Sequence, residues 1–394
     1  MNRSRIIITL ILSSGVFVFV GCPPKVPEQA ELGAHLLGLT GEQVAQFQQG
    51  KAVFQRVFAP ETGLGPLFNS NSCGECHEDP VLGGFGDEAE VHASRFIGPN
   101  NCDPLFQEGG PVIQQFATPL LQAAGIQKEQ IPPSATSQAI RTSPQVFGFG
   151  LIDGIPEQTI LVNEDPNDAN GDGISGRANR FIDGRVGRFG RKAFVPALFD
   201  FNSGAFPLEQ GITTPFSPVE ETINGQPVPP GTDPAPDPEI PQSAIEQVNN
   251  FVRFLAPPPR KFGKDHHERD QISRGERIFR EIKCATCHVP QMETGPGNIK
   301  ALNKQKVNLY SDLLLHDMGP ELADICLGLA GPEEFRTELL MGLRFRTRFL
   351  HDGSANSIRR AIELHGGEAG NSRNAFNALS DKDMEALLKF LDTI

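Results

Sequence analysis

Tryptophan is absent from the sequence, and there is a single tyrosine, Tyr310. Phenylalanine is the abundant aromatic residue, with 28 copies, so it must supply most of the aromatic packing in any core. Basic residues are also in deficit: 35 lysines and arginines stand against 48 aspartates and glutamates, for a net charge of −13. Proteins that bind nucleic acid need a basic surface, so this balance argues against a nucleic-acid partner.

The N-terminus is typical of an export signal. Two arginines give it a positive start, and the apolar run Ile6–Val20 that follows is short for a membrane span. The run ends in a small residue and Cys22, which resembles a lipoprotein signal in which the cysteine becomes lipidated, although Phe19 departs from the usual leucine. A plain secretory signal is the alternative.

This signal defines the first two of four predicted segments. Residues 1–21 are the predicted lipoprotein-type signal peptide, and residues 22–39 are a tether that begins with several prolines. We therefore expect a periplasmic protein that is held at a membrane through a lipid on Cys22.

Four of the seven cysteines form two copies of Cys-x-x-Cys-His, the attachment pattern of c-type haem. Cysteines at this spacing can each form a thioether to a haem vinyl group, and the histidine can reach the iron. The residues are Cys73, Cys76 and His77 in the first motif and Cys284, Cys287 and His288 in the second. A zinc site would need four ligands in one compact module, and a redox dithiol would need no histidine. The sequence therefore predicts two covalently attached c-type haems.

Two further cysteines, Cys102 and Cys326, belong to neither motif. In an oxidising compartment two leftover cysteines can pair. The sequence does not give their distance, so a disulfide and two free thiols both stay open.

Helical patterns accompany both haem motifs. Thr40 opens a capping box, and apolar residues follow it at helical spacing before the first motif. Ser273 is predicted to cap a helix that ends just before the second motif, and Ser380 to cap a last helix with a buried stripe from Met384 to Leu391. Because a cytochrome c domain begins with a helix that leads into its haem motif, the chain contains two such beginnings.

The predicted fold class is mainly α, with two cytochrome c-like haem domains and long irregular loops rich in proline and glycine. Residues 205–241 are dense in proline and acidic groups, which predicts a loop. A helix predicted at 244–255 ends at a run of three prolines. The predicted domains are residues 40–256, an N-terminal haem domain with a large loop insertion, and residues 257–394, a C-terminal cytochrome c-like domain.

Four stretches outside the haem motifs resemble the di-haem oxidoreductase family, whose members are described as peroxidases. They are Gly65–Asn69, Leu313–Gly319, Leu350–Ala355 and Ile362–Ala369. The chain is more distantly similar to the bacterial di-haem cytochrome c peroxidases and to the maturation enzyme MauG. The resemblance covers most of the chain after the signal, and it implies an oxidoreductase with two haems in different roles.

The resemblance also implies a sixth ligand for the haem of His288. In the di-haem peroxidases a His-x-Gly stretch precedes the distal ligand of the second haem, and the same offset from His351 leads to His365. We therefore expect His365 to bind this iron, with Met318 and His316 as the alternatives. Two histidine ligands would give a lower potential than a histidine and a methionine.

The haem of His77 is expected to keep an open position, where peroxide or oxygen can react. The nearest histidines in the sequence, His35 and His92, are expected to be surface or structural residues. Heterolysis of peroxide also needs a group that moves a proton. A segment resembling the family's distal pocket leads into Asp153 and Glu157, which are the predicted catalytic acids; the alternative is that they only cap a helix.

A third predicted site is a calcium loop. Asp168, Asn170 and Asp172 stand at positions 1, 3 and 5 of a calcium-loop pattern, with glycine at position 6. Asn179 stands at position 12 instead of the usual glutamate, so a tight turn is the alternative. The di-haem peroxidases bind calcium between their domains, and the resemblance therefore favours calcium here.

Arginines cluster at 177–191 and again at 344–348. Some of them can pair with haem propionates, for which the guanidinium fork is well shaped; solvated surface charge is the alternative. Within Gly187–Ala193 the chain has arginine where members of the family carry a tryptophan between the haems. A tryptophan relay is therefore excluded, and direct transfer between the haems or Tyr310 would have to replace it.

These predictions describe an exported di-haem enzyme. The second haem would receive electrons from a small redox protein, a cytochrome c or a cupredoxin, and pass them to the first. The first haem would reduce hydrogen peroxide or oxidise another small substrate. The alternatives are a di-haem electron carrier without catalysis and an oxygenase similar to the rubber oxygenase.

Overall fold

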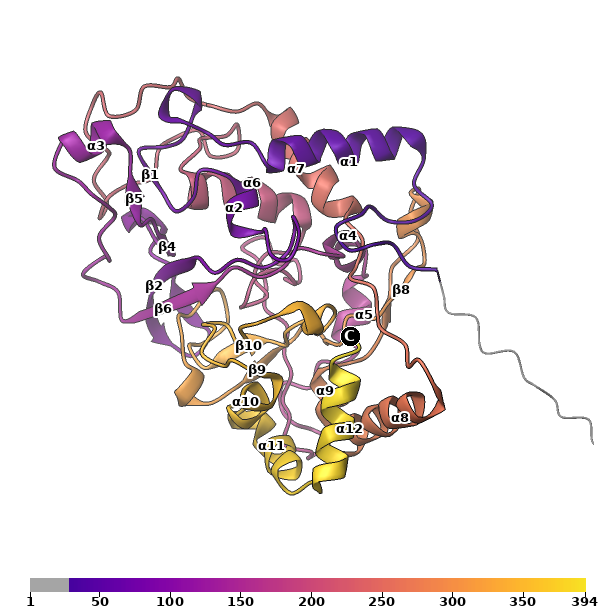
Figure 1. Cartoon of the computed structure of the whole chain (residues 1–394). Helices are drawn as coiled ribbons and strands as arrows, with labels where there is room; N and C mark the ends of the chain where they lie inside the picture. The colour runs from indigo at the N-terminus through magenta and orange to yellow at the C-terminus, as the bar shows by residue number, and fades with distance from the viewer. Residues whose placement is uncertain (1–27) are drawn as a thin grey trace, which may run out of the picture.

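The computed structural model describes residues 28–394 of the chain (Figure 1). The predicted signal peptide, residues 1–21, and the predicted lipidation site Cys22 lie outside the described residues. Within the described range, no helix combines the length and the apolar character needed to cross a membrane.

Helices are the main secondary structure, and short strands and 3-10 turns connect them. The α-helices are α1 (Gly41–Phe54), α2 (Cys73–Cys76), α3 (Pro119–Ala123), α4 (Phe149–Asp153), α5 (Glu157–Leu161), α6 (Leu198–Gln210), α7 (Gln242–Phe254), α8 (His266–Glu281), α9 (Cys284–Cys287), α10 (Ile358–Glu363), α11 (Gly370–Asn377) and α12 (Asp381–Leu391). The strands are β1 (Leu67–Phe68), β2 (Ala89–Gly98), β3 (Asn101–Asp103), β4 (Val112–Ile113), β5 (Phe116–Ala117), β6 (Ser137–Thr142), β7 (Met292–Glu293), β8 (Lys306–Val307), β9 (Leu315–Asp317) and β10 (Glu334–Arg336). The 3-10 turns are η1 (Pro60–Thr62), η2 (Phe106–Glu108), η3 (Lys300–Leu302), η4 (Pro320–Leu322), η5 (Leu343–Phe345) and η6 (Gly367–Ala369).

Two pairs of crossing helices repeat one packing scheme, α1 on α7 and α8 on α12 (Figure 1). Gly50 lets α1 approach the backbone of α7, because a Cβ at this position would lie 2.0 Å from the carbonyl oxygen of Gln247. Gly275 does the same for α8, where a Cβ would lie 2.0 Å from the carbonyl oxygen of Ala386. The haem-motif helices α2 and α9 are the next α-helices along the chain after α1 and α8, so the same frame is built twice.

The helix starts test the capping predictions. The capping box of Thr40 is confirmed, and so is the cap by Ser380, whose side chain accepts the N–H of Asp383. The predicted start at Ser273 is wrong, because α8 already begins at His266. Asp265 caps this earlier start by accepting a backbone N–H in the first turn, which leaves Ser273 inside the helix.

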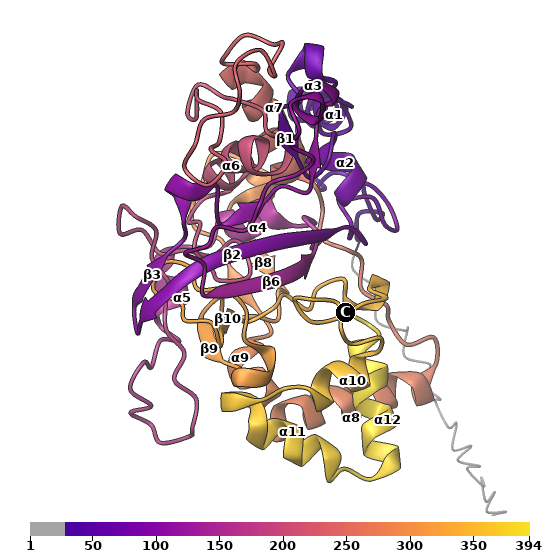
Figure 2. The ribbon, with the colours of Figure 1, turned by 90° about the vertical axis from the view of Figure 1, so that its left-hand side faces the viewer.

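An antiparallel sheet of four strands was not predicted. β2 pairs with β3, β4 and β6, and Figure 2 shows β2 and β6 as long strands lying side by side. The sheet was hard to recognise in the sequence because β2 carries polar residues on its buried face, among them His92 and Ser94. Strand alternation is normally recognised from apolar residues on the inner face.

The loop predicted at 205–241 begins later than expected. Helix α6 continues to Gln210 with Pro207 inside it, so the loop prediction is wrong for the first six residues. Pro207 removes one helical hydrogen bond, but Phe206 beside it is buried and α6 ends only one turn later. The structure assigns neither helix nor strand between Gln210 and Gln242.

The main hydrophobic core draws on both sides of the domain boundary that the sequence predicts at residue 257. Phe147 and Phe251 come from one side, and Leu313 and Met341 come from the other. A separate core, which includes Phe279, holds helices α8 to α12 together. Helices α8 to α12 thus form one body. Between α9 and α10 the chain leaves this body and contributes residues to the main core, and its path can be followed in Figure 2.

Part of the predicted tether is packed against the N-terminal core. The N–H of Leu36 donates to the carbonyl oxygen of Phe254 at 2.8 Å, and the N–H of Ala256 donates to that of Ala34 at 3.0 Å. Leu36 is buried. Within the described part of the predicted tether, these residues are therefore fixed to the end of α7.

A disulfide joins Cys102 on β3 to Cys326, across a sequence separation of 224. It settles the pairing that the sequence left open. It also ties the sheet to the loop after η4, where the Sγ of Cys326 lies 3.3 Å from the Oγ of Ser94.

Replacing Cys102 and Cys326 together with serine is expected to lower the free energy of unfolding by roughly 2–5 kcal/mol, because a long loop gains entropy in the unfolded chain. Urea denaturation of the full chain measures the loss. Wild-type protein unfolded in the presence of a reductant is the control and should lose a similar amount. Equal midpoints for the variant and the oxidised wild type would contradict a stabilising disulfide.

Candidate functional site

The first haem motif forms the short helix α2, which Ser72 caps by accepting the N–H of Gly74. His77 follows directly, and its Nδ1 lies 3.3 Å from the carbonyl oxygen of Gly84, to which it can donate. Its ring packs 5.9 Å from that of Phe54. With Nδ1 held by a carbonyl, Nε2 is the nitrogen that can bind iron.

The second haem motif repeats this arrangement in α9. The Nδ1 of His288 lies 3.0 Å from the carbonyl oxygen of Tyr310, again leaving Nε2 for a metal. Burial lowers the pKa of His288 to about 4, so its ring is neutral at physiological pH. A neutral imidazole is the form that ligates iron.

A cavity lined mainly by apolar side chains adjoins the second motif. Cys284, Cys287 and His288 from α9 line it, and so does His365, which comes just after α10. The Nδ1 of His365 lies 2.7 Å from the carbonyl oxygen of Ala361, so its Nε2 is also the free nitrogen. The structure therefore brings the predicted proximal and distal ligands of the second haem to one cavity.

The two alternatives to His365 differ in their surroundings. His316 has both ring nitrogens engaged, with Nε2 at 2.8 Å from Asp312 Oδ2 and Nδ1 at 2.8 Å from Glu368 Oε2. Burial alone would lower its pKa, but hydrogen bonds with Asp312, Cys287 and Glu368 outweigh this and raise the pKa of His316 to about 12. An imidazolium carries a proton on both ring nitrogens and therefore has no lone pair with which to bind iron. Met318 also lines the cavity and stays an alternative.

The His316 ion pair predicts a pH-dependent stability. Because the pKa of folded His316 is raised from 6.5 to about 12, its stabilising contribution is complete below pH 6.5 and is lost as the pH rises toward 12. Asp312→Asn is expected to lower the free energy of unfolding by about 3–5 kcal/mol near pH 6, and by less near pH 9. Chemical denaturation at the two pH values measures the difference, and equal losses at both would contradict a charged His316.

The structure does not bring the predicted acids Asp153 and Glu157 into a hydrogen bond with the first motif. The Oδ1 of Asp153 accepts the N–H of Leu198 at 2.8 Å, at the start of α6. The Oε1 of Glu157 accepts the N–H of Val186 at 3.1 Å. Burial raises the pKa of Asp153, which makes its protonated form easier to populate.

Another carboxylate, which the sequence analysis missed, lies close to the first motif. Glu90 on β2 is 3.2 Å from the Nε2 of His92 through Oε2, and it accepts from the Oγ of Ser143 at 3.2 Å through Oε1. Its charge acts on His77, whose pKa burial lowers and Glu90 raises. The only signal in the sequence was Glu-x-His, which places both side chains on one face of a strand.

The predicted calcium ligands share one exposed loop but are occupied by backbone groups. Both carboxylate oxygens of Asp168 lie 3.2 Å from the N–H of Gly173, and the Oδ1 of Asn170 accepts the N–H of Asp172 at 2.9 Å. The loop leads directly into Ser175, whose Oγ donates to Glu368 at 2.6 Å. A calcium ion at Asp168, Asn170 and Asp172 stays a prediction.

The described residues fit a haem in the second cavity. Two neutral histidines offer their free nitrogens to it, two cysteines stand at the attachment spacing, and the walls are mainly apolar. The buried Nε atoms of Arg191 and Arg346, both in the cavity wall, have no hydrogen-bond partner within residues 28–394. Unpaired donors beside an apolar space suit a large apolar cofactor with anionic groups at its edge.

A comparison with protein families identifies the class. The family described as "di-haem oxidoreductase, putative peroxidase" matches residues 128–394, most of the chain. The chain belongs to this family, as the resemblance in the sequence implied. It is therefore an oxidoreductase of a class that carries two haems.

Comparisons with individual proteins add only distant likenesses. Hydrazine synthase of Kuenenia stuttgartiensis aligns over 100% of both chains with 12% identity and a TM-score of 0.39. A MauG-like protein associated with microbial copper homeostasis aligns over 95% of each chain, with 14% identity and a TM-score of 0.40. A variant of the diheme peroxidase BthA of Burkholderia thailandensis aligns over 94% of this chain and 89% of its own, with 14% identity and a TM-score of 0.40. These scores carry no functional argument, and no curated protein matches the chain.

Proposed function

We propose that the protein is an exported di-haem c-type cytochrome with peroxidase-like activity, in which electrons arrive at the second haem and the reaction takes place at the first. The observation that carries the proposal is the difference between the two sites. His365 and His288 line one cavity with their Nε2 atoms unbonded, whereas His92, near the first site, is bonded through its Nε2 to Glu90.

The two motifs would hold the haems covalently. Cys73 and Cys76 would attach the first haem above His77, and Cys284 and Cys287 the second above His288. When bound, the first haem supplies the redox chemistry by which hydrogen peroxide takes up two electrons and two protons and becomes two molecules of water. The carbonyl oxygens of Gly84 and Tyr310 fix the tautomers of the two proximal histidines.

Proton transfer at the first haem would fall to a buried carboxyl group. Asp153 and Glu157 are the candidates that the family resemblance supplies, and each has one oxygen occupied by a backbone N–H. Glu90 is a third candidate, favoured by its bonds to His92 and Ser143 and by its effect on the charge of His77. Such a group would move a proton between the two oxygens of peroxide.

The remaining proposals concern the surroundings of the enzyme. A small redox protein, a cytochrome c or a cupredoxin, would donate electrons, and hydrogen peroxide or another small molecule would be the substrate. The lipid on Cys22 would hold the protein to a membrane facing the periplasm. Calcium at Asp168, Asn170 and Asp172 would stiffen the loop that leads to Ser175, which is bonded to Glu368 three residues after His365.

A steady-state assay tests the function. The full chain with both haems is mixed with a reduced cytochrome c or a dye donor, and donor oxidation is followed as hydrogen peroxide is added. We expect saturable oxidation that depends on peroxide. Absence of turnover, together with six-coordinate irons in every redox state, would instead favour the electron carrier. A stable oxygen complex at the first haem would favour an oxygenase.

A further inference from the structure

Three arginines converge on one glutamate in the wall of the second haem cavity. Arg191 lies 2.9 Å and Arg336 3.2 Å from Glu338 Oε2, and Arg346 lies 3.2 Å from Oε1. All four residues line the cavity that His288 and His365 share. The arginine side chains are at most 8% exposed, so water does not screen their charges effectively.

This cluster carries more positive charge than its protein partners neutralise. Three guanidinium groups remain protonated, whereas Glu338 contributes one negative charge. Burial would raise the pKa of Glu338, but the three arginines overcome this and hold it at about 2. The next acidic group that acts on Arg336, Asp312, is already bonded to His316. Two positive charges are left over in an apolar surrounding.

The hydrogen bonding of the cluster is also incomplete. The buried Nε atoms of Arg191 and Arg346 have no partner among the described residues. A buried guanidinium N–H without an acceptor lowers the stability of the folded protein unless a ligand supplies the acceptor. A ligand that satisfies the cluster would therefore bring two negative charges and carboxylate-like acceptors to the cavity wall.

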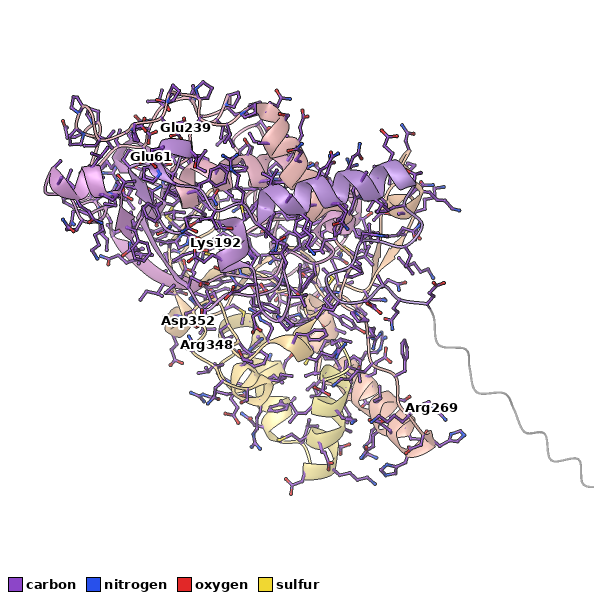
Figure 3. All side chains as sticks on the ribbon, turned by 45° about the horizontal axis from the view of Figure 1, so that its top comes forward. Glu61, Lys192, Glu239, Arg269, Arg348 and Asp352 are labelled. Atoms are coloured by element: carbon purple, nitrogen blue, oxygen red, sulfur yellow. A yellow bond between two sulfur atoms is a disulfide. The ribbon has the colours of Figure 1, made fainter. Side chains whose placement is uncertain are left out.

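The cluster reaches from this cavity toward the first haem motif. The Nη2 of Arg191 donates to the carbonyl oxygen of Thr142 at 3.1 Å, next to the Ser143 that is bonded to Glu90. The guanidinium of Arg346 lies 4.8 Å from the ring centroid of Phe85, in the loop just after the first motif. Figure 3 labels Arg348, two residues after Arg346 in the chain, where the larger body meets the lower helices.

We propose that Arg191, Arg336 and Arg346 bind the two propionates of the second haem, so that a cationic cluster lies between the two haem sites. A haem brings two propionate groups, which match the two uncompensated charges. Arginine forks suit carboxylates in a bidentate arrangement. The inference rests on the haem assignments of the proposed function, but it does not depend on turnover of peroxide.

The cluster sets the potential of the second haem. A positive charge close to the iron favours its reduced state, which carries one positive charge fewer than the oxidised state. The arginines therefore raise the potential of the second haem and shift the sharing of electrons with the first. Glu338 acts in the opposite direction. Removing a positive charge should therefore lower the potential of the second haem, and removing the negative charge of Glu338 should raise it.

A potentiometric titration of the purified full chain, followed by the absorption of each haem, tests the proposal. Arg191→Gln and Arg346→Gln are each expected to lower the second potential relative to the first, by at least tenfold in the electron-sharing equilibrium, about 59 mV. Glu338→Gln is expected to raise it. Arg344→Gln is the matched control, because Arg344 donates to the carbonyl oxygen of Pro259 at 2.8 Å and does not line the cavity.

Each outcome of the titration decides the matter. Opposite shifts for the arginine and glutamate variants, with Arg344→Gln unchanged, support the proposal. Incomplete attachment of the second haem in Arg191→Gln and Arg346→Gln alone supports it too, because the propionates would then not be held while the thioether bonds form. Unchanged potentials, or shifts of one sign in all variants, overturn it. A protein without peroxide turnover still gives both potentials, so failure of the proposed function is seen separately.

Discussion

Replacing His365 with alanine is expected to convert the second haem from a low-spin to a high-spin iron. Two imidazole ligands impose a strong field, and alanine leaves the sixth position to water or to no ligand. His365 lines the cavity of His288, and its Nδ1 is bonded to the carbonyl oxygen of Ala361. Low-temperature EPR of the oxidised protein measures the change, which should affect one haem completely and leave the other unaltered.

Met318→Leu is the matched control for this replacement, because Met318 lines the same cavity and is the remaining alternative ligand. We expect Met318→Leu to keep the low-spin signal. The ligand assignment would be wrong if the His365 variant kept the low-spin signal and the Met318 variant lost it. His316 is not expected to replace His365 as the iron ligand in the variant, because both of its ring nitrogens are hydrogen-bonded to carboxylates.

Replacing Cys73 and Cys76 with alanine is expected to abolish peroxide turnover, because it removes the haem that we propose as the site of the reaction. The covalent haem content should fall from two per chain to one, and the low-spin signal of the second haem should persist. The loss of turnover should be at least about a thousandfold, since His288 and His365 are proposed to fill both positions on the iron of the second haem. Haem content, EPR and the steady-state assay measure these three quantities.

Alanine at Cys284 and Cys287 is the matched control for the first motif. It should also remove one haem, but the high-spin signal should then persist and the low-spin signal should vanish. Turnover with a protein donor should fall as well, because electrons would no longer arrive through the second haem. Two results together would mean that the roles of the two haems are exchanged. The first-motif variant would keep its turnover, and the second-motif variant would lose its high-spin signal.

The sequence predicted the parts of the protein that local chemistry determines. The two haem motifs, the capping box of Thr40 and the cap at Ser380 depend on spacings of a few residues, and the structure has both caps. The family also followed from short stretches, such as the one around His365. Local rules failed where two signals competed, as at α8, which Asp265 starts before Ser273.

Long-range features were not predictable in the same way. The disulfide joins residues separated by 224 positions, and only the fold sets their distance. The buried face of β2 carries His92 and Ser94, so its alternation did not stand out from the sequence. The ion pair of Arg191 with Glu338 likewise joins residues far apart in the chain. Nothing local distinguishes this arginine from the exposed ones nearby.

Low-temperature EPR of the oxidised wild-type protein, with one equivalent of hydrogen peroxide added to a second sample, tests the central claim most directly. We expect one low-spin signal, from the haem of His288 and His365, and one high-spin signal, from the haem of His77. Peroxide should remove the high-spin signal first. Two low-spin signals that peroxide leaves unchanged would contradict the account.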